Sequence, residues 1–89
     1  MAAYELKLAA SAERMLARLP EFAAAAIVEF ITGPLLENPQ RVGKALGLEL
    51  AGYSSARRGA YRVVYRIEGD KVVRVVRIDH RADVYRSRG

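Results

Sequence analysis

The chain has 89 residues, a formal net charge of +5, one histidine and no cysteine. This length supports one domain with a single modest core, so residues 1–89 are expected to form one domain. The absence of cysteine excludes a disulfide framework and a thiolate metal site. No apolar run approaches the roughly 18 residues of a membrane span. These features predict a cytoplasmic protein without a membrane partner.

The positive charge is concentrated in the second half of the chain. Residues 1–40 carry three basic and five acidic side chains, whereas residues 41–89 carry twelve basic and five acidic ones. One-sided cation density of this kind is typical of proteins that bind nucleic acid. A solubilising surface and a docking face for an acidic protein are the alternatives.

The first third of the chain predicts one strand and a pair of helices. Residues 4–8 alternate between apolar and polar, which indicates a half-buried strand. Ser11 is a plausible N-cap for a helix that Pro20 ends, and residues 21–31 form a second helix. The two helices are expected to form a hairpin that covers one sheet face. Their bulky apolar side chains are expected in the core: Met15, Phe22 and Phe30.

Prolines end the helical region. Gly33-Pro34 interrupts the second helix, and Asn38-Pro39 ends the region. Residues 38–47 are expected to form a loop that carries two cations, Arg41 and Lys44. Residues 48–53 then predict a strand, and residues 54–56 predict a flexible turn.

Two β-branched runs on either side of Glu68-Gly69-Asp70 predict a β-hairpin, because Gly69 tolerates a positive φ. Side chains alternate along a strand, so two sets are expected on opposite faces of the first run: Tyr61, Val63, Tyr65 and Ile67 on one, and Arg62, Val64, Arg66 and Glu68 on the other. The second run, residues 72–78, has apolar residues on both faces, so neither face is wholly polar. It predicts a central strand covered on both sides.

Residues 79–83 predict a polar crossover, and residues 84–86 predict a last short strand. The resulting order is β-α-α-β-β-β-β. It indicates the α+β class, with a four-stranded antiparallel segment packed on the helices.

Most catalytic devices are absent from the sequence. It contains no glycine-rich phosphate loop, no cysteine nucleophile, and no cluster of His, Asp and Glu at metal-ligand spacing. We therefore expect neither a metal nor a cofactor. What remains is a set of basic and aromatic residues: Lys44, Arg57, Arg58, Arg62, Arg81, Arg86, His80, Tyr61 and Tyr85.

This set suits metal-free scission of RNA by its own 2′-hydroxyl group. Guanidinium groups bind phosphate oxygens in bidentate geometry and stabilise the extra negative charge of the transition state. His80 is a natural proton carrier, and Tyr85 can stack on a base. The alternative is that His80 is only a turn residue and that the tyrosines belong to the core.

The pattern resembles the RelE family of toxins, within the RelE/ParE group of bacterial toxin–antitoxin systems. The matching segments are Asn38-Pro39-x-Arg41-x-Gly43-Lys44-x-Leu46, Leu50-x-Gly52-x-x-Ser55-x-Arg57-x-Gly59-x-Tyr61-Arg62-Val63-Val64-Tyr65 and His80-Arg81-Ala82-Asp83-Val84-Tyr85. With the N-terminal strand and the helical hairpin, the resemblance covers essentially the whole chain.

The resemblance implies a RelE-like fold, cleavage of mRNA in the ribosomal A site, and neutralisation by a RelB-like antitoxin that folds on the toxin as a hetero-oligomer. Arg62 resembles the arginine that contacts the scissile phosphate. Arg81 resembles the arginine of the family's final crossover, and Tyr85 resembles the terminal-strand tyrosine that stacks on the substrate. His80 matches the variant of the crossover in which a histidine precedes that arginine. Lys44 and Arg57 fall in the basic rim that the resemblance implies, and Arg41 and Arg58 are further candidates for binding the RNA.

Two departures from the family pattern affect these expectations. Residues 52–56 contain none of the lysines that the RelE type has before the hairpin, so the general base is not identified. The chain ends at Gly89, so the C-terminal helix of some relatives is not expected. The alternatives are a ParE-like toxin that inhibits DNA gyrase without cleaving RNA, and an inactive relative that only binds antitoxin.

Overall fold

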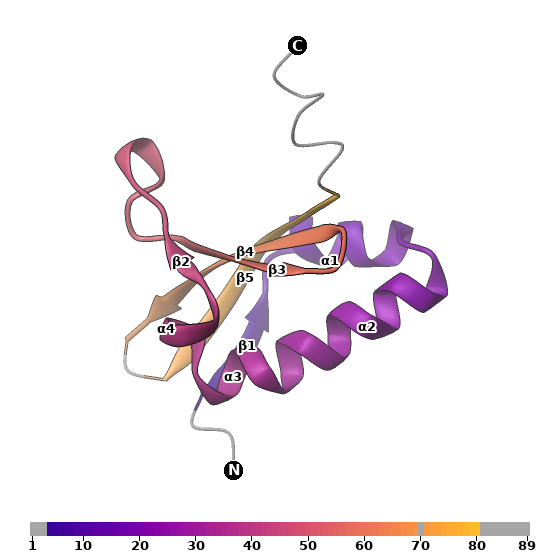
Figure 1. Ribbon diagram of the computed structural model, residues 1–89, viewed down its shortest axis with the longest axis horizontal. Coiled ribbons are helices and arrows are strands. Elements are labelled where there is room, and N and C mark those ends of the chain that lie inside the picture. The colour runs from indigo at the N-terminus through magenta and orange to yellow at the C-terminus, as the bar shows by residue number, and fades with distance from the viewer. Residues whose placement is uncertain (1–3, 70, 81–89) are drawn as a thin grey trace.

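The computed structural model describes residues 4–69 and 71–80. It contains one five-stranded sheet with the strand order β1-β5-β4-β3-β2, and the helices pack against it (Figure 1). Strand β1 runs parallel to β5, and every other neighbouring pair is antiparallel. The α+β class predicted from the sequence is confirmed, with a mixed sheet in place of a purely antiparallel one.

The N-terminal elements are β1 (Glu5–Leu8), α1 (Ala10–Arg18) and α2 (Glu21–Thr32), close to the predicted ranges. The prediction that Ser11 is an N-cap is wrong, because Ala9 holds that position without a side-chain cap. The Ser11 hydroxyl instead donates a hydrogen bond of 2.6 Å to the Val76 carbonyl of β5. This bond ties α1 to the sheet. None of the helices in the described ranges has the length and hydropathy needed to cross a membrane.

The middle of the chain differs most from the prediction. Two short helices, α3 (Pro34–Glu37) and α4 (Pro39–Val42), lead into the short strand β2 (Lys44–Ala45). The strand predicted at residues 48–53 is wrong, because Leu48–Leu50 forms a 3₁₀ turn, η1, in which Leu48 has a φ of 55° and is 96% exposed. Figure 1 shows this segment as a loop that projects from the sheet.

The turn predicted at residues 54–56 is instead the start of strand β3 (Ser54–Arg58). β3 pairs antiparallel with β4 (Tyr61–Glu68) through a tight turn in which Gly59 has a φ of 61°. Serine, alanine and arginine favour strands weakly, but pairing with the apolar β4 overrides that preference. The glycine at the turn is the sequence signal for this second hairpin.

The predicted hairpin is confirmed: β4 pairs with β5 (Val72–His80), and Gly69 has a φ of 58° in the turn. The register shifts between Val64 and Tyr65, where β5 has one extra residue, Val76. β5 pairs on both edges, but the prediction that it is covered on both faces is wrong. One face belongs to the core, and the other carries charged side chains: Arg74, Arg77 and Asp79.

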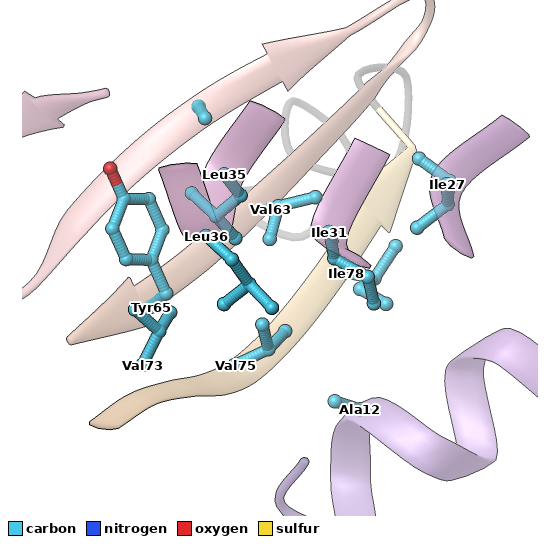
Figure 2. Close-up of a cluster of buried hydrophobic side chains, with 11 residues drawn as sticks. Ala12, Ile27, Ile31, Leu35, Leu36, Val63, Tyr65, Val73, Val75 and Ile78 are labelled. Atoms are coloured by element: carbon cyan, nitrogen blue, oxygen red, sulfur yellow. The ribbon is translucent and has the colours of Figure 1, made fainter. Parts of the chain in front are cut away.

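The core lies between the helices and one face of the sheet (Figure 2). Ile27, Ile31 and Leu35 of the helices face Val63 and Ile78 of the strands, and all are at most 1% exposed. Of the helix residues expected in the core, Met15 and Phe30 pack against this cluster. The expectation for Phe22 is wrong, because its side chain is 87% exposed.

Tyr65 joins the sheet to the α3–α4 region. Its side chain is fully buried, and its hydroxyl donates a hydrogen bond to the Pro39 carbonyl. The backbone of Gly43 passes so close that a Cβ atom there would overlap the Tyr65 hydroxyl and lie 2.9 Å from the Ser55 carbonyl oxygen. A glycine is therefore required at residue 43 for lack of space.

We predict that Gly43→Ala lowers the free energy of unfolding by about 1–3 kcal/mol, because overpacking a buried contact forces its neighbours to move. Urea denaturation followed by circular dichroism measures the change. Gly47→Ala is the matched control, because nothing lies within 4 Å of the added methyl group.

A double-mutant cycle with Tyr65→Phe tests the assigned cause. Because this change removes the overlapping hydroxyl group, Gly43→Ala should cost less in the Tyr65→Phe background than in the wild type. Equal costs in the two backgrounds would contradict the assignment.

Candidate functional site

The face of the sheet opposite the core carries most of the cations of the strands. Strand alternation and register place one set of basic residues on it, called here the arginine face: Lys7, Lys44, Arg57, Arg62, Arg66, Arg74 and Arg77. Three carboxylates share this face: Glu5, Glu68 and Asp79. Some of these cations form ion pairs with these carboxylates, and others do not.

At the end of the sheet near the β4–β5 turn, Glu68 holds two arginines. Its Oε2 atom accepts hydrogen bonds of 2.8 Å from Nε of Arg66 and from Nε of Arg74. Arg66 also stacks over the Tyr53 ring, with 5.6 Å between the guanidinium carbon and the ring centroid. The hydrogen bond from Arg74, followed by that from Arg66, lowers the pKa of Glu68. At pH values above the ordinary carboxyl pKa, these two arginines therefore stabilise the folded sheet. This contribution is lost as the pH falls through the lowered pKa of Glu68.

At the other end of the sheet, the cations are less compensated. Arg57 and Arg62 are register partners on adjacent strands, and neither forms an ion pair within residues 4–69 and 71–80. The half-buried Arg62 has a Nε atom that is shielded from solvent and has no hydrogen-bond partner in these ranges. This end of the face therefore has guanidinium charge available for an anion.

Asp79 is the register partner of Arg62 on β5. It is 7% exposed, and its Oδ1 atom accepts a hydrogen bond of 3.2 Å from Arg77. Its Oδ2 atom lies 3.1 Å from the same guanidinium without a good hydrogen-bond angle. The carboxylate beside Arg62 in the described strands is thus engaged by Arg77 and forms no ion pair with Arg62.

The remaining cations nominated from the sequence are spread around this end. Lys44 is exposed on β2, opposite Ser55 in the arginine face. Arg58 is the partner of Tyr61, so it points to the helix side, where it borders a hollow of about 380 Å³ with Phe22. Arg41 is exposed on α4. The strand register therefore places Arg57, but not Arg58, on the same face of the sheet as Arg62.

His80 is the last residue of β5 and the register partner of Tyr61. Their rings meet edge to face, with 5.1 Å between the centroids and an angle of 84° between the planes. Alternation turns His80 to the side of the sheet opposite Arg62, so the structure does not bring these two side chains together. Arg81, Tyr85, Arg86 and the strand predicted at residues 84–86 lie outside the described residues.

Sequence reasoning missed Arg77 and Asp79 as neighbours of Arg62. Their signal was the alternation on residues 72–80, which the register shift at Val76 hides, because the extra residue reverses the apparent face. In residues 4–69 and 71–80, no three His, Cys, Asp or Glu side chains are grouped so that they could hold a metal ion. The chemistry that the described site supports is anion binding by guanidinium groups.

Comparisons with known proteins agree with this architecture. Residues 6–85 match the family model described as the ParE toxin of type II toxin–antitoxin system, parDE. Two toxins of Mycobacterium tuberculosis are similar over 84 residues, or 93% of this chain. Toxin RelG is 50% identical with 97% of its length covered, and Toxin RelE is 52% identical with 87% covered.

Solved structures give the same result. The toxin–antitoxin complex RelBE2 of M. tuberculosis contains a chain with a TM-score of 0.86 and 49% identity, over 93% of this chain and 97% of that one. The isolated E. coli RelE toxin has a TM-score of 0.73 at 23% identity, over 97% and 95% of the two chains, and supports the fold alone. The chain therefore belongs to the RelE/ParE superfamily and is a toxin of a type II toxin–antitoxin system.

Proposed function

We propose that this toxin is a ribosome-dependent endoribonuclease that cleaves mRNA in the ribosomal A site and thereby inhibits translation. The observation that carries the proposal is Arg62, a half-buried guanidinium without a partner among the described residues, next to Arg57 in the arginine face. An unpartnered, shielded donor is costly in a folded protein, and a phosphate group would satisfy it. The RelE names of relatives about 50% identical support the same assignment.

The proposed reaction is attack of the ribose 2′-hydroxyl group on the adjacent phosphate. The 2′-oxygen loses its proton, the new P–O bond forms, and the 5′-oxygen leaves with a proton, giving a 2′,3′-cyclic phosphate. Arg62 would hold the phosphate and stabilise the added negative charge, with Arg57 and Lys44 along the RNA backbone. By resemblance, Arg81 would join Arg62 at the phosphate, and Tyr85 would stack on the substrate.

The proposed partner in the cell is a cognate antitoxin of the RelB type. The solved RelBE2 structure of M. tuberculosis, which contains a chain 49% identical to this one, is a toxin–antitoxin complex. The cations of this chain would attract an acidic antitoxin segment that folds as it binds. Persistence of full toxicity in the presence of stoichiometric cognate antitoxin would refute this part of the proposal.

A second candidate, inhibition of DNA gyrase, is favoured by the match to a family model described as ParE. Primer extension on RNA from expressing cells separates the two functions. Discrete cuts within open reading frames support the nuclease, whereas DNA damage without cuts supports gyrase inhibition. Unaffected growth without antitoxin would indicate an inactive, antitoxin-binding relative.

We predict that Arg62→Ala slows cleavage on the order of 10²–10³-fold in a reconstituted ribosome assay, because it removes a donor aimed at the transition-state charge. Arg62→Lys should recover only part of the rate, since lysine lacks the bidentate fork. Lys71→Ala is the control, because this exposed cation follows the β4–β5 turn, at the far end of the sheet. Undiminished cutting by Arg62→Ala would refute the role of Arg62.

The proton-carrier role of His80 stays a prediction from the sequence, and its place on the other side of the sheet defines the test. We expect His80→Gln to slow single-turnover cleavage less than Arg62→Ala does, because alternation separates the two side chains. A loss as large as that of Arg62→Ala would contradict this expectation and would support the proton-carrier role.

A further inference from the structure

A second basic site lies beside the arginine face, between α1 and the end of β5. It is a hollow of about 610 Å³. Residues of α1 and β5 line it, among them Ser11, Arg14, Met15, Arg18, Arg77 and Asp79. Neither Arg14 nor Arg18 was expected from the sequence to have a functional role.

The hollow is positively charged. Arg14 and Arg18 are exposed and stand one helical turn apart, so they share a face of α1. Neither forms an ion pair within residues 4–69 and 71–80, whereas Arg77 is bound to Asp79. Three arginines therefore face one carboxylate. The location is notable because residues 1–40, which contain Arg14 and Arg18, carry a net negative charge overall.

Asp79 connects this hollow to the proposed cleavage site, since it lines the hollow and is also the register partner of Arg62. Arg57 on β3, Arg62 on β4 and the hollow beyond β5 thus follow one another across the same end of the sheet. Adjacent strands are about 4.8 Å apart, so these cations lie within reach of one extended strand of nucleic acid.

We propose that the hollow binds backbone phosphates of the RNA strand adjacent to the cleaved nucleotide, with Arg14 and Arg18 as its ligands. This inference rests on the proposed function and adds a binding site to it. Guanidinium groups one turn apart suit successive phosphates of one strand, and continuity with Arg62 favours RNA over an acidic protein segment. Contacts of this kind increase affinity and position the chain without reading its bases.

The salt dependence of binding to a short single-stranded RNA tests the proposal. The RNA carries 2′-O-methyl groups, so the attack of a 2′-hydroxyl group cannot occur during the measurement. For the double variant Arg14→Gln/Arg18→Gln, we expect weaker binding than wild type. The slope of log K against log salt should be shallower by about 1.4, because each phosphate contact on a single strand contributes about 0.7.

Two controls accompany the double variant. Lys71→Gln should leave the slope unchanged, because Lys71 stands at the other end of the sheet. Arg14→Lys/Arg18→Lys should keep the wild-type slope, because it keeps both charges. Circular dichroism of each variant reports folding.

The outcomes separate the inference from the proposed function. An unchanged slope in the double variant, or a wild type that does not bind the RNA, overturns the inference even if message on ribosomes is still cut. A shallower slope in the double variant, together with a wild type that cuts no ribosome-bound message, supports the hollow and refutes the nuclease. Unchanged RNA binding with weakened antitoxin binding would assign the hollow to the antitoxin and overturn the inference.

Discussion

The alternation of side chains along β4 and β5 is the constraint on which the rest of the structure depends. One set, including Val63, Tyr65 and Ile78, is buried against the helices, while the opposite set carries arginines. The same pairing therefore builds the core and presents the charge. The extra residue at Val76 preserves this division, because it returns Ile78 to the core and Asp79 to the face of Arg62.

Charge compensation then separates structural cations from those that a ligand can reach. Glu68 holds Arg66 and Arg74 at one end of the sheet, whereas Arg57 and Arg62 form no ion pair with any described residue at the other. Counting cations would not distinguish the two groups, but their hydrogen bonds do. Function in this toxin is thus expected at the end where the protein leaves guanidinium charge unused.

Much of the fold was predictable from local patterns, including the β4–β5 hairpin with Gly69 and the helix boundary at Pro20. Strand β3 was not, because its weak strand formers are ordered by pairing with β4. The strand predicted at residues 48–53 is wrong because its pattern of apolar leucines suggested a half-buried strand, whereas Leu48 and Leu50 lie exposed in η1. Of the candidate site residues, Arg57, Arg62 and Lys44 were nominated from the sequence and lie on one face of the sheet. The separation of His80 from Arg62 depends on a register that the sequence does not give.

The central claim is that the 2′-hydroxyl group of the RNA itself is the nucleophile, and a single substitution in the message tests this claim most directly. The message carries a 2′-deoxy nucleotide in the A site, directly 5′ of the cut. Ribosomes programmed with this message are treated with the toxin, and the products are mapped. Loss of the cut at that nucleotide, together with 2′,3′-cyclic phosphate ends on the unmodified message, is the result expected if the RNA supplies its own nucleophile. Undiminished cleavage of the 2′-deoxy message would contradict it.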